Sequence, residues 1–232
     1  PNSGKVWDII QKYNVKTFYT APTALRAIRK YDPNLEYLNK VKNNIKNLES
    51  IHLSGERCDP ETYIWLRDKL DIYFGKNFNT ESLVDMSNIF LQCKSLISLD
   101  LSSFNTKNVI NMKNMFQSCT NLISINFNNF ETNQVTDMSG MFNECVNLKN
   151  IDLFKFNAKN VNNMEEMFKN CESFENLILN SFDTTKVTKM NEMFYGCKNI
   201  NVLDISSFNC EACIEYNNVF HNSKIVNVLI DN

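Results

Sequence analysis

Phenylalanines recur at a fixed interval of 26 residues through most of the chain. Self-similarity at one period is typical of repeat proteins, in which stacked units bury a core that no single unit could bury. The sequence therefore predicts six tandem repeats over residues 78–232, numbered from their first phenylalanines. One column is Phe78, Phe104, Phe130, Phe156, Phe182 and Phe208, and the other is Phe90, Phe116, Phe142, Phe168, Phe194 and Phe220.

Two hydrophobic periods coexist within each repeat. From Val109 to Cys119 the apolar residues are three or four positions apart, which predicts a short amphipathic helix. The polar residues expected to cap this helix are Asp85, Asn111, Asp137 and Asn163, whereas Lys189 breaks the pattern. Farther on, Leu99-Asp100-Leu101 alternates with period two, which predicts a half-buried strand. We therefore expect an α/β fold in which six strand-helix coils form a solenoid.

The sixth repeat departs from the consensus of the others. It carries Tyr216 for the first methionine, Ser223 for the cysteine, and Ile230 where a strand Asp is expected. A degraded last repeat is interpreted as a cap.

Residues 1–77 follow a different pattern, in which longer helices alternate with short β-branched or aromatic runs. This alternation predicts a partial parallel α/β segment. The expected helices cover residues 5–13 and begin at Pro22 and at Asp59-Pro60-Glu61, and the expected strands are Lys16–Thr20, Leu48–Leu53 and Asp71–Phe74.

Charge and composition exclude some classes of partner. The 232 residues carry a formal net charge of −2, which provides no broad basic face for nucleic acid. No apolar run approaches the length of a membrane span, and the first residues lack the pattern of a secretory signal. The absence of Asn-x-Ser/Thr favours an intracellular location. The chain begins at Pro1 and is expected to be a fragment.

Five of the eight cysteines share one repeat position, Cys93, Cys119, Cys145, Cys171 and Cys197. They lie on the apolar face with methionine and phenylalanine, so we expect buried structural thiols and core columns. Cys210 and Cys213 form a lone C-x-x-C without a second pair, which argues against a zinc or thioredoxin-like site. His52 and His221 are isolated, so no catalytic triad and no metal site are expected.

The segments VWDIIQKYNVKTFYTAPTALRAIRKYDP and LESIHLSGERCDPETYIWLRDKLDIYFGKNF resemble the AMP-forming acetyl- and propionyl-CoA synthetases. The resemblance implies that Gly55, Glu56 and Arg57 are nucleotide-contacting positions. The family's next motif is replaced by Asn77-Phe78-Asn79-Thr80-Glu81, and its phosphate loop, its ribose-binding segment and its C-terminal domain with the acylation lysine are absent. We therefore expect no ligase activity, and a role for ATP or CoA only if a complete synthetase domain lies upstream.

The repeated motif Asn-Val-x-x-Met-x-x-Met-Phe-x-x-Cys-x-x-Leu-x-x-Leu-Asp-Leu resembles the BspA-like leucine-rich repeats, also found in mycoplasma lipoproteins. This resemblance implies a leucine-rich-repeat-like solenoid used for adhesion or protein–protein binding. The partner is an unidentified protein.

One row of strand residues is a candidate interaction strip. Its polar members are expected to point away from the core on neighbouring coils, where they would form an acidic recognition surface or a weak cation site, or simply a solvated face. Ile178 interrupts this row. The strip consists of Asp100, Asn126, Asp152 and Asp204.

Three interpretations of the whole chain follow. The first is an interaction module, residues 78–232, fused to an inactive synthetase-like remnant, residues 1–77. The second is a piece of a short-chain acyl-CoA ligase whose other parts lie upstream of Pro1. The third is an artificial junction of two neighbouring genes at Phe78, which fits both families.

Overall fold

The computed structural model describes residues 4–14, 17–20, 22–41, 50–53, 83–94, 96–102 and 104–231. The chain divides into two compact units, Pro1–Leu83 and Val84–Asn232. The expected boundary at Phe78 lies outside the described residues, as do the helix start at Asp59-Pro60-Glu61 and the strand Asp71–Phe74.

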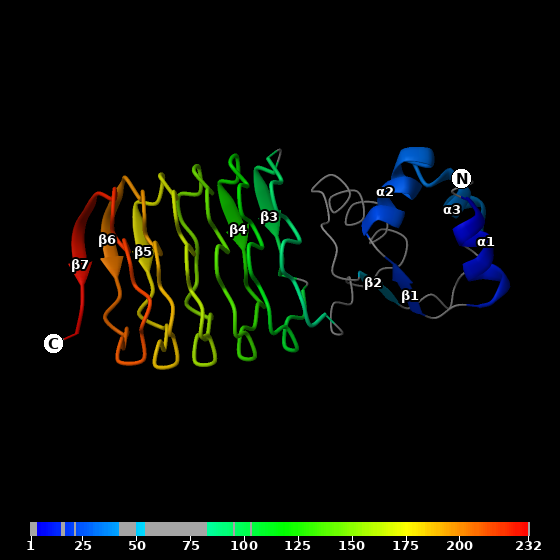
Figure 1. Ribbon diagram of the computed structural model, residues 1–232. Helices are drawn as coiled ribbons and strands as arrows, with labels where there is room; N and C mark the ends of the chain where they lie inside the picture. The colour runs from blue at the N-terminus through cyan, green and yellow to red at the C-terminus, as the bar shows by residue number, and fades with distance from the viewer. Residues whose placement is uncertain are drawn as a thin grey trace. The chain divides into compact units, whose positions relative to one another are not determined.

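The first unit combines helices with a pair of parallel strands (Figure 1). Thr17 lies opposite Ser50, and Thr20 lies opposite Leu53. Two expected helices and two expected strands are confirmed. The elements are α1 (Gly4–Lys12), β1 (Thr17–Thr20), α2 (Pro22–Tyr31), α3 (Glu36–Val41) and β2 (Ser50–Leu53).

Helix α3 is a short element that the hydrophobic pattern did not predict. The Asp32 carboxylate caps its first turn, because Oδ1 accepts the Glu36 N–H at 2.6 Å and Oδ2 accepts that of Tyr37 at 3.1 Å. Leu35 and Leu38 are buried, so packing of this apolar side stabilises a helix of only six residues.

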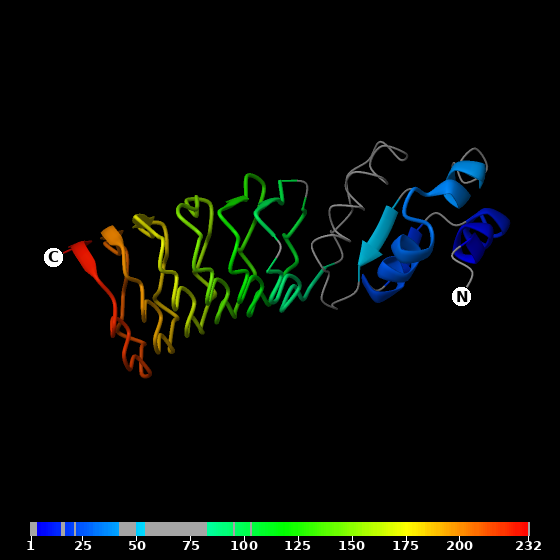
Figure 2. The ribbon, with the colours of Figure 1, turned by 90° about the horizontal axis from the view of Figure 1, so that it is seen from above.

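The second unit, here called the repeat array, stacks successive repeats side by side (Figures 1 and 2). Isolated parallel β-bridges pair residues that are 26 positions apart. The series runs from Asp85 and Asn111 to Lys189 and Glu215. The array's strands pair in parallel, in sheets ordered β3-β4 and β5-β6-β7. Their bounds are β3 (Ser98–Asp100), β4 (Ser124–Asn126), β5 (Asn176–Ile178), β6 (Ile200–Asp204) and β7 (Ile225–Leu229).

The prediction of an amphipathic helix in each repeat was wrong, because the described repeats form turns there. In the second repeat the Met115 N–H donates to the Met112 carbonyl and the Cys119 N–H to that of Phe116, which closes consecutive tight turns. The intervening Phe116 N–H donates instead to the Met141 carbonyl of the next repeat, at 2.9 Å. Left-handed φ angles of 54° at Asn114 and 58° at Ser118 are also incompatible with a helix. Chains of turns bring apolar residues three or four positions apart to one side, which mimics helical spacing.

The polar residues expected to cap those helices instead organise the turns. The Oδ1 atom of Asp137 accepts the Ser139 N–H at 2.8 Å, and that of Asn163 accepts the Glu165 N–H at 3.0 Å. Asp85 and Asn111 do the same in the first two repeats. Short Asp and Asn side chains favour this bond to the N–H two residues on, which explains the abundance of these residues.

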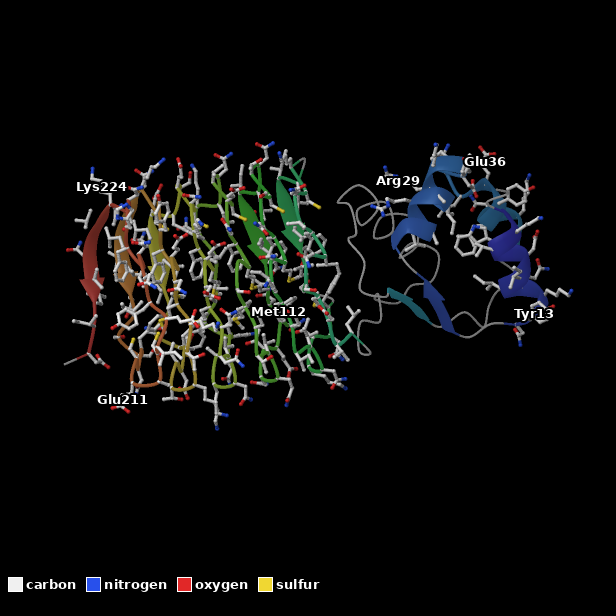
Figure 3. The ribbon with its side chains drawn as sticks, in the orientation of Figure 1. Tyr13, Arg29, Glu36, Met112, Glu211 and Lys224 are labelled. Carbon is white, nitrogen blue, oxygen red and sulfur yellow. The ribbon has the colours of Figure 1, made fainter. Side chains whose placement is uncertain are left out.

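The described phenylalanines of the first five repeats are buried in the core of the repeat array, as expected, whereas Phe208 and Phe220 of the sixth repeat are partly exposed. One column stacks nearly face to face, with ring centroids 5.6 Å apart for Phe116–Phe142 and 5.5 Å for Phe142–Phe168. Phe127 packs edge-on against Phe130 and Phe156 of the other column. Figure 3 shows Met112 in the interior of the array, whereas Glu211 and Lys224 project from its outside.

The sixth repeat pairs with a register that differs from the expected one. Asp204 lies opposite Leu229 and Leu203 opposite Val228, so this step is 25 residues rather than 26. Ile230 therefore does not replace a strand Asp, because the one-residue shift places Leu229 there. Phe220 is 45% exposed whereas Phe194 is 1% exposed, so the sixth repeat leaves part of the apolar face uncovered.

Candidate interaction surface

The strip residues are placed on one side of the array by the strands that they end. Asp100 ends β3 opposite Asn126, which ends β4, and Asp204 ends β6 opposite Ile178. The third repeat has no strand between residues 149 and 153, but the Glu175 N–H donates to the Lys149 carbonyl at 3.5 Å. Asp152 lines one hollow together with Asn126, so these two strip residues lie next to each other.

Each strip residue also holds a bend in its own repeat. The Oδ1 atom accepts a backbone N–H two residues on, at 2.9 Å for Asp100, 3.1 Å for Asn126 and 3.0 Å for Asp152. Asp204 accepts both the N–H and the hydroxyl of Ser206, at 3.1 and 2.7 Å. These residues therefore have a structural role besides any role in recognition.

The members of the strip differ in accessibility. Asp100 and Asp152 are exposed and Asn126 is half-buried, whereas Asp204 is only 8% exposed. Asp204 therefore departs from the expected solvated face: it is buried where β6 pairs with β7, and its carboxylate accepts the Ser206 hydroxyl. Ile178, which interrupts the row, is 45% exposed.

Phe154 is a surface residue that the sequence reasoning missed. It is 74% exposed, and its N–H donates to the Asp152 carboxylate at 3.0 Å, so it directly follows the strip. The signal was present in the sequence, because this column is polar in the other repeats that contain it. Its members there are Ser102, Asn128, Asn180, Ser206 and Asn232.

A small hollow of about 70 Å³ lies beside the strip, between the second and third repeats. Asn126 and Asp152 line it together with Phe127 and Lys155. The Lys155 ammonium donates to the Asn128 carbonyl at 2.7 Å. The hollow is too small for a drug-sized ligand, and Asn126 and Asp152 are the two strip residues that line it.

A larger polar hollow of about 470 Å³ lies over the turns, and three of the acidic side chains that line it already have partners. The Lys169 ammonium lies 2.8 Å from Glu166 and 2.6 Å from Glu192, and the Asn191 amide donates to Glu165 at 2.7 Å. Burial opposes the charge on Lys169, but its two carboxylate partners outweigh this and raise its pKa. This internal compensation makes the hollow a weaker candidate than the strip.

The cysteine row is buried, as expected. The thiols of Cys119, Cys145, Cys171 and Cys197 each donate to a phenylalanine carbonyl in the preceding repeat, at 3.0 to 3.2 Å. Burial raises the pKa of Cys197 to about 12 and raises that of Cys145 still further. Such thiols are structural, because their thiolate forms are strongly disfavoured.

The remaining candidate residues are dispersed. Gly55, Glu56 and Arg57 lie outside the described residues, and His52 lies in β2. His221 stacks against Tyr195 with ring centroids 5.5 Å apart. Within the described ranges, no group of three or more His, Cys, Asp or Glu residues is arranged to hold a metal ion. Nor does any helix in that part of the chain have the length and apolar character needed to cross a membrane.

The repeats match one protein-family model twice, over residues 69–178 and 120–232. The model is described as "Mycoplasma protein of unknown function, DUF285". No solved structure matches the chain.

Other similarity is to acyl-CoA synthetases over a short segment. An acetyl-coenzyme A synthetase of Ralstonia nicotianae is 40% identical over 65 residues, which are 28% of this chain and 10% of that protein. A propionate–CoA ligase of Escherichia coli is 36% identical over 83 residues, 35% of this chain and 13% of the ligase. The chain thus spans about a tenth of the length of these curated relatives.

Proposed function

Because the chain belongs to the family described as "Mycoplasma protein of unknown function, DUF285" through residues 69–232, we propose that its repeats form a leucine-rich-repeat-like solenoid that binds a partner protein. Stacked repeats create extended surfaces on which side chains from successive units line up. The exposed and half-buried strip residues Asp100, Asn126 and Asp152, together with Phe154 and Ile178, are the binding surface in this proposal.

The observation that carries the proposal is the exposure of Phe154. A phenylalanine that is 74% exposed gains nothing from the core, and aromatic residues are typical anchors of protein interfaces. Ile178, 45% exposed in the next repeat, extends the apolar area. An isolated exposed apolar residue needs no explanation, but one whose N–H is bonded to an exposed acidic residue of the strip fits a contact point.

The chemistry of the surface specifies the kind of partner. Asp100 and Asp152 are exposed carboxylates on the same row as Ile178, and Phe154 follows Asp152. A matching partner presents an apolar recess for Phe154 with lysine or arginine side chains at its rim. The apolar contact would supply most of the affinity, whereas the charges would orient the encounter.

Photo-crosslinking in cells tests this proposal with the full chain. Benzoylphenylalanine at position 154 is expected to trap a discrete partner, whereas the same group at Ile110, itself 46% exposed, is not. Changing Asp100 and Asp152 together to Asn removes two charges but keeps an acceptor for each bend, as Asn126 shows. This double variant should reduce crosslinking from position 154 several-fold. Equal trapping at positions 154 and 110 would contradict the proposal.

We propose further that the synthetase-like segment has no ligase activity in this chain. The observation behind this is that the matched segment covers only 10 to 13% of the relatives. In-line transfer requires phosphates and Mg²⁺ to be held together, which needs residues from several parts of such enzymes. The full chain is therefore expected to give no propionate-dependent exchange of pyrophosphate into ATP above a protein-free blank. Exchange above the blank would overturn this.

A further inference from the structure

Two cysteines occupy a corner of the sixth repeat where the earlier repeats carry other residues. Thr106, Thr132, Ala158 and Thr184 precede Cys210 in one column, and Val109, Val135, Val161 and Val187 precede Cys213 in the other. In the earlier repeats all of these side chains are buried, at 0 or 1% exposure. In the earlier repeats, the side chains at both of these positions therefore point into the interior of the array.

The corner is a tight turn that brings the two cysteines together. The Cys213 N–H donates to the Cys210 carbonyl at 3.0 Å, as the Val187 N–H does to Thr184 at 2.9 Å. A turn of this kind holds its first and fourth Cα atoms within about 7 Å. Disulfides join Cα atoms roughly 4.4 to 6.8 Å apart. The backbone thus meets the main distance requirement for a bond between Cys210 and Cys213.

This pair is accessible, in contrast to the buried cysteine row. Cys210 is exposed and Cys213 is half-buried, and neither is in a disulfide; the Cys213 thiol makes only long contacts, to the Thr188 and Glu215 carbonyls at 3.8 and 3.7 Å. They line a cavity of about 490 Å³ together with Phe208, Tyr216 and Phe220. The cavity exists because the sixth repeat leaves part of the apolar face uncovered. A small reagent can therefore reach both sulfur atoms.

We propose that Cys210 and Cys213 are a redox-active dithiol that closes to a disulfide by exchange with a small disulfide. The Cys210 thiolate attacks one sulfur of the small disulfide, which forms a mixed disulfide and releases one thiol. The Cys213 thiolate then attacks the Cys210 sulfur and releases the second thiol. The chain loses two protons and two electrons, and the small disulfide is reduced to two thiols.

The order of attack follows from accessibility. Cys210 is exposed and meets the reagent first, whereas burial raises the pKa of Cys213 and slows its direct reaction with reagents. Once the mixed disulfide has formed, the position of Cys213 in the same turn makes the second step intramolecular. Glu211 lies between the cysteines in the sequence and Asp231 lines the cavity, so the site is surrounded by negative charge. This charge favours a cationic disulfide as the reagent.

Treatment of the full chain with cystamine, a small cationic disulfide, tests the proposal. Peptide mass spectrometry after acid quenching is expected to show that the peptide with both cysteines has lost two hydrogen atoms and carries no adduct. Cys213→Ser should instead keep a stable cysteamine adduct on Cys210. Cys93, Cys119, Cys145, Cys171 and Cys197 should stay unmodified, which serves as an internal control for the native fold.

Two results would overturn the proposal, and both come from the unaltered chain, so they do not depend on whether a variant folds. One is a lasting cysteamine adduct on Cys210 with Cys213 still reduced. The other is the absence of any modification at either cysteine while the buried row also stays unmodified.

Discussion

Replacing Phe142 by alanine is expected to lower the free energy of unfolding of the repeat array by about 3–5 kcal/mol. Phe142 is fully buried and stacks between Phe116 and Phe168 at 5.6 and 5.5 Å. Its removal leaves a cavity in the middle of the column and deprives both neighbours of a stacking partner. Urea denaturation followed by circular dichroism measures the loss as a lower midpoint.

Phe154→Ala is the matched control, because it removes the same side chain from a position that is 74% exposed. We expect a change within about 0.5 kcal/mol. A similar loss for the two variants would mean that Phe154 is also part of the core, and this would contradict its proposed role as a surface anchor.

Thr132→Val is expected to cost about 1–3 kcal/mol, although it preserves the shape of the side chain. The buried Thr132 hydroxyl donates to the Asn157 carbonyl at 3.0 Å and accepts the Asn157 N–H at 2.7 Å. It thereby satisfies two backbone groups of the next repeat, and valine would leave both without this partner. The same urea titration measures the difference.

Thr136→Val is the control for the change in chemistry. The Thr136 hydroxyl also donates to a carbonyl of a neighbouring repeat, that of Ile110 at 3.1 Å, but the side chain is exposed. Water can replace this bond, so we expect a change within about 0.5 kcal/mol. If Thr132→Val changed the free energy of unfolding by equally little, the Thr132 hydroxyl would not contribute significantly to the contact between repeats.

Most features with a local physical cause were predicted from the sequence. Pro22 opens α2 as expected, since its missing N–H has no helical partner to lose. The described phenylalanines of the first five repeats are core residues, because a residue repeated at one period must face the same side of every stacked unit. The prediction of a short helix was wrong because one apolar spacing fits both a helix and a chain of turns. This spacing is that of Val109, Met112, Phe116 and Cys119.

The candidate surface was predicted only in part. Alternation around Asp100 identified the strip, but it could not show that Asp204 is buried and that its carboxylate accepts the Ser206 hydroxyl. The signal for Phe154 is that the equivalent position is polar in the other repeats, which the hydrophobic pattern within a single repeat does not reveal. The C-x-x-C spacing of Cys210 and Cys213 is evident from the sequence. Only the structure shows that one turn brings the two cysteines together beside a cavity.

The sequence by itself determined the period and the identity of the core columns, because these depend on residue type and spacing alone. Only the tertiary structure decided where the backbone hydrogen bonds go. In a helix, the Phe116 N–H would bond four residues back, whereas here it bonds to Met141 in the next repeat. Both choices satisfy the same donor, so stacking against the neighbouring repeat decides between them.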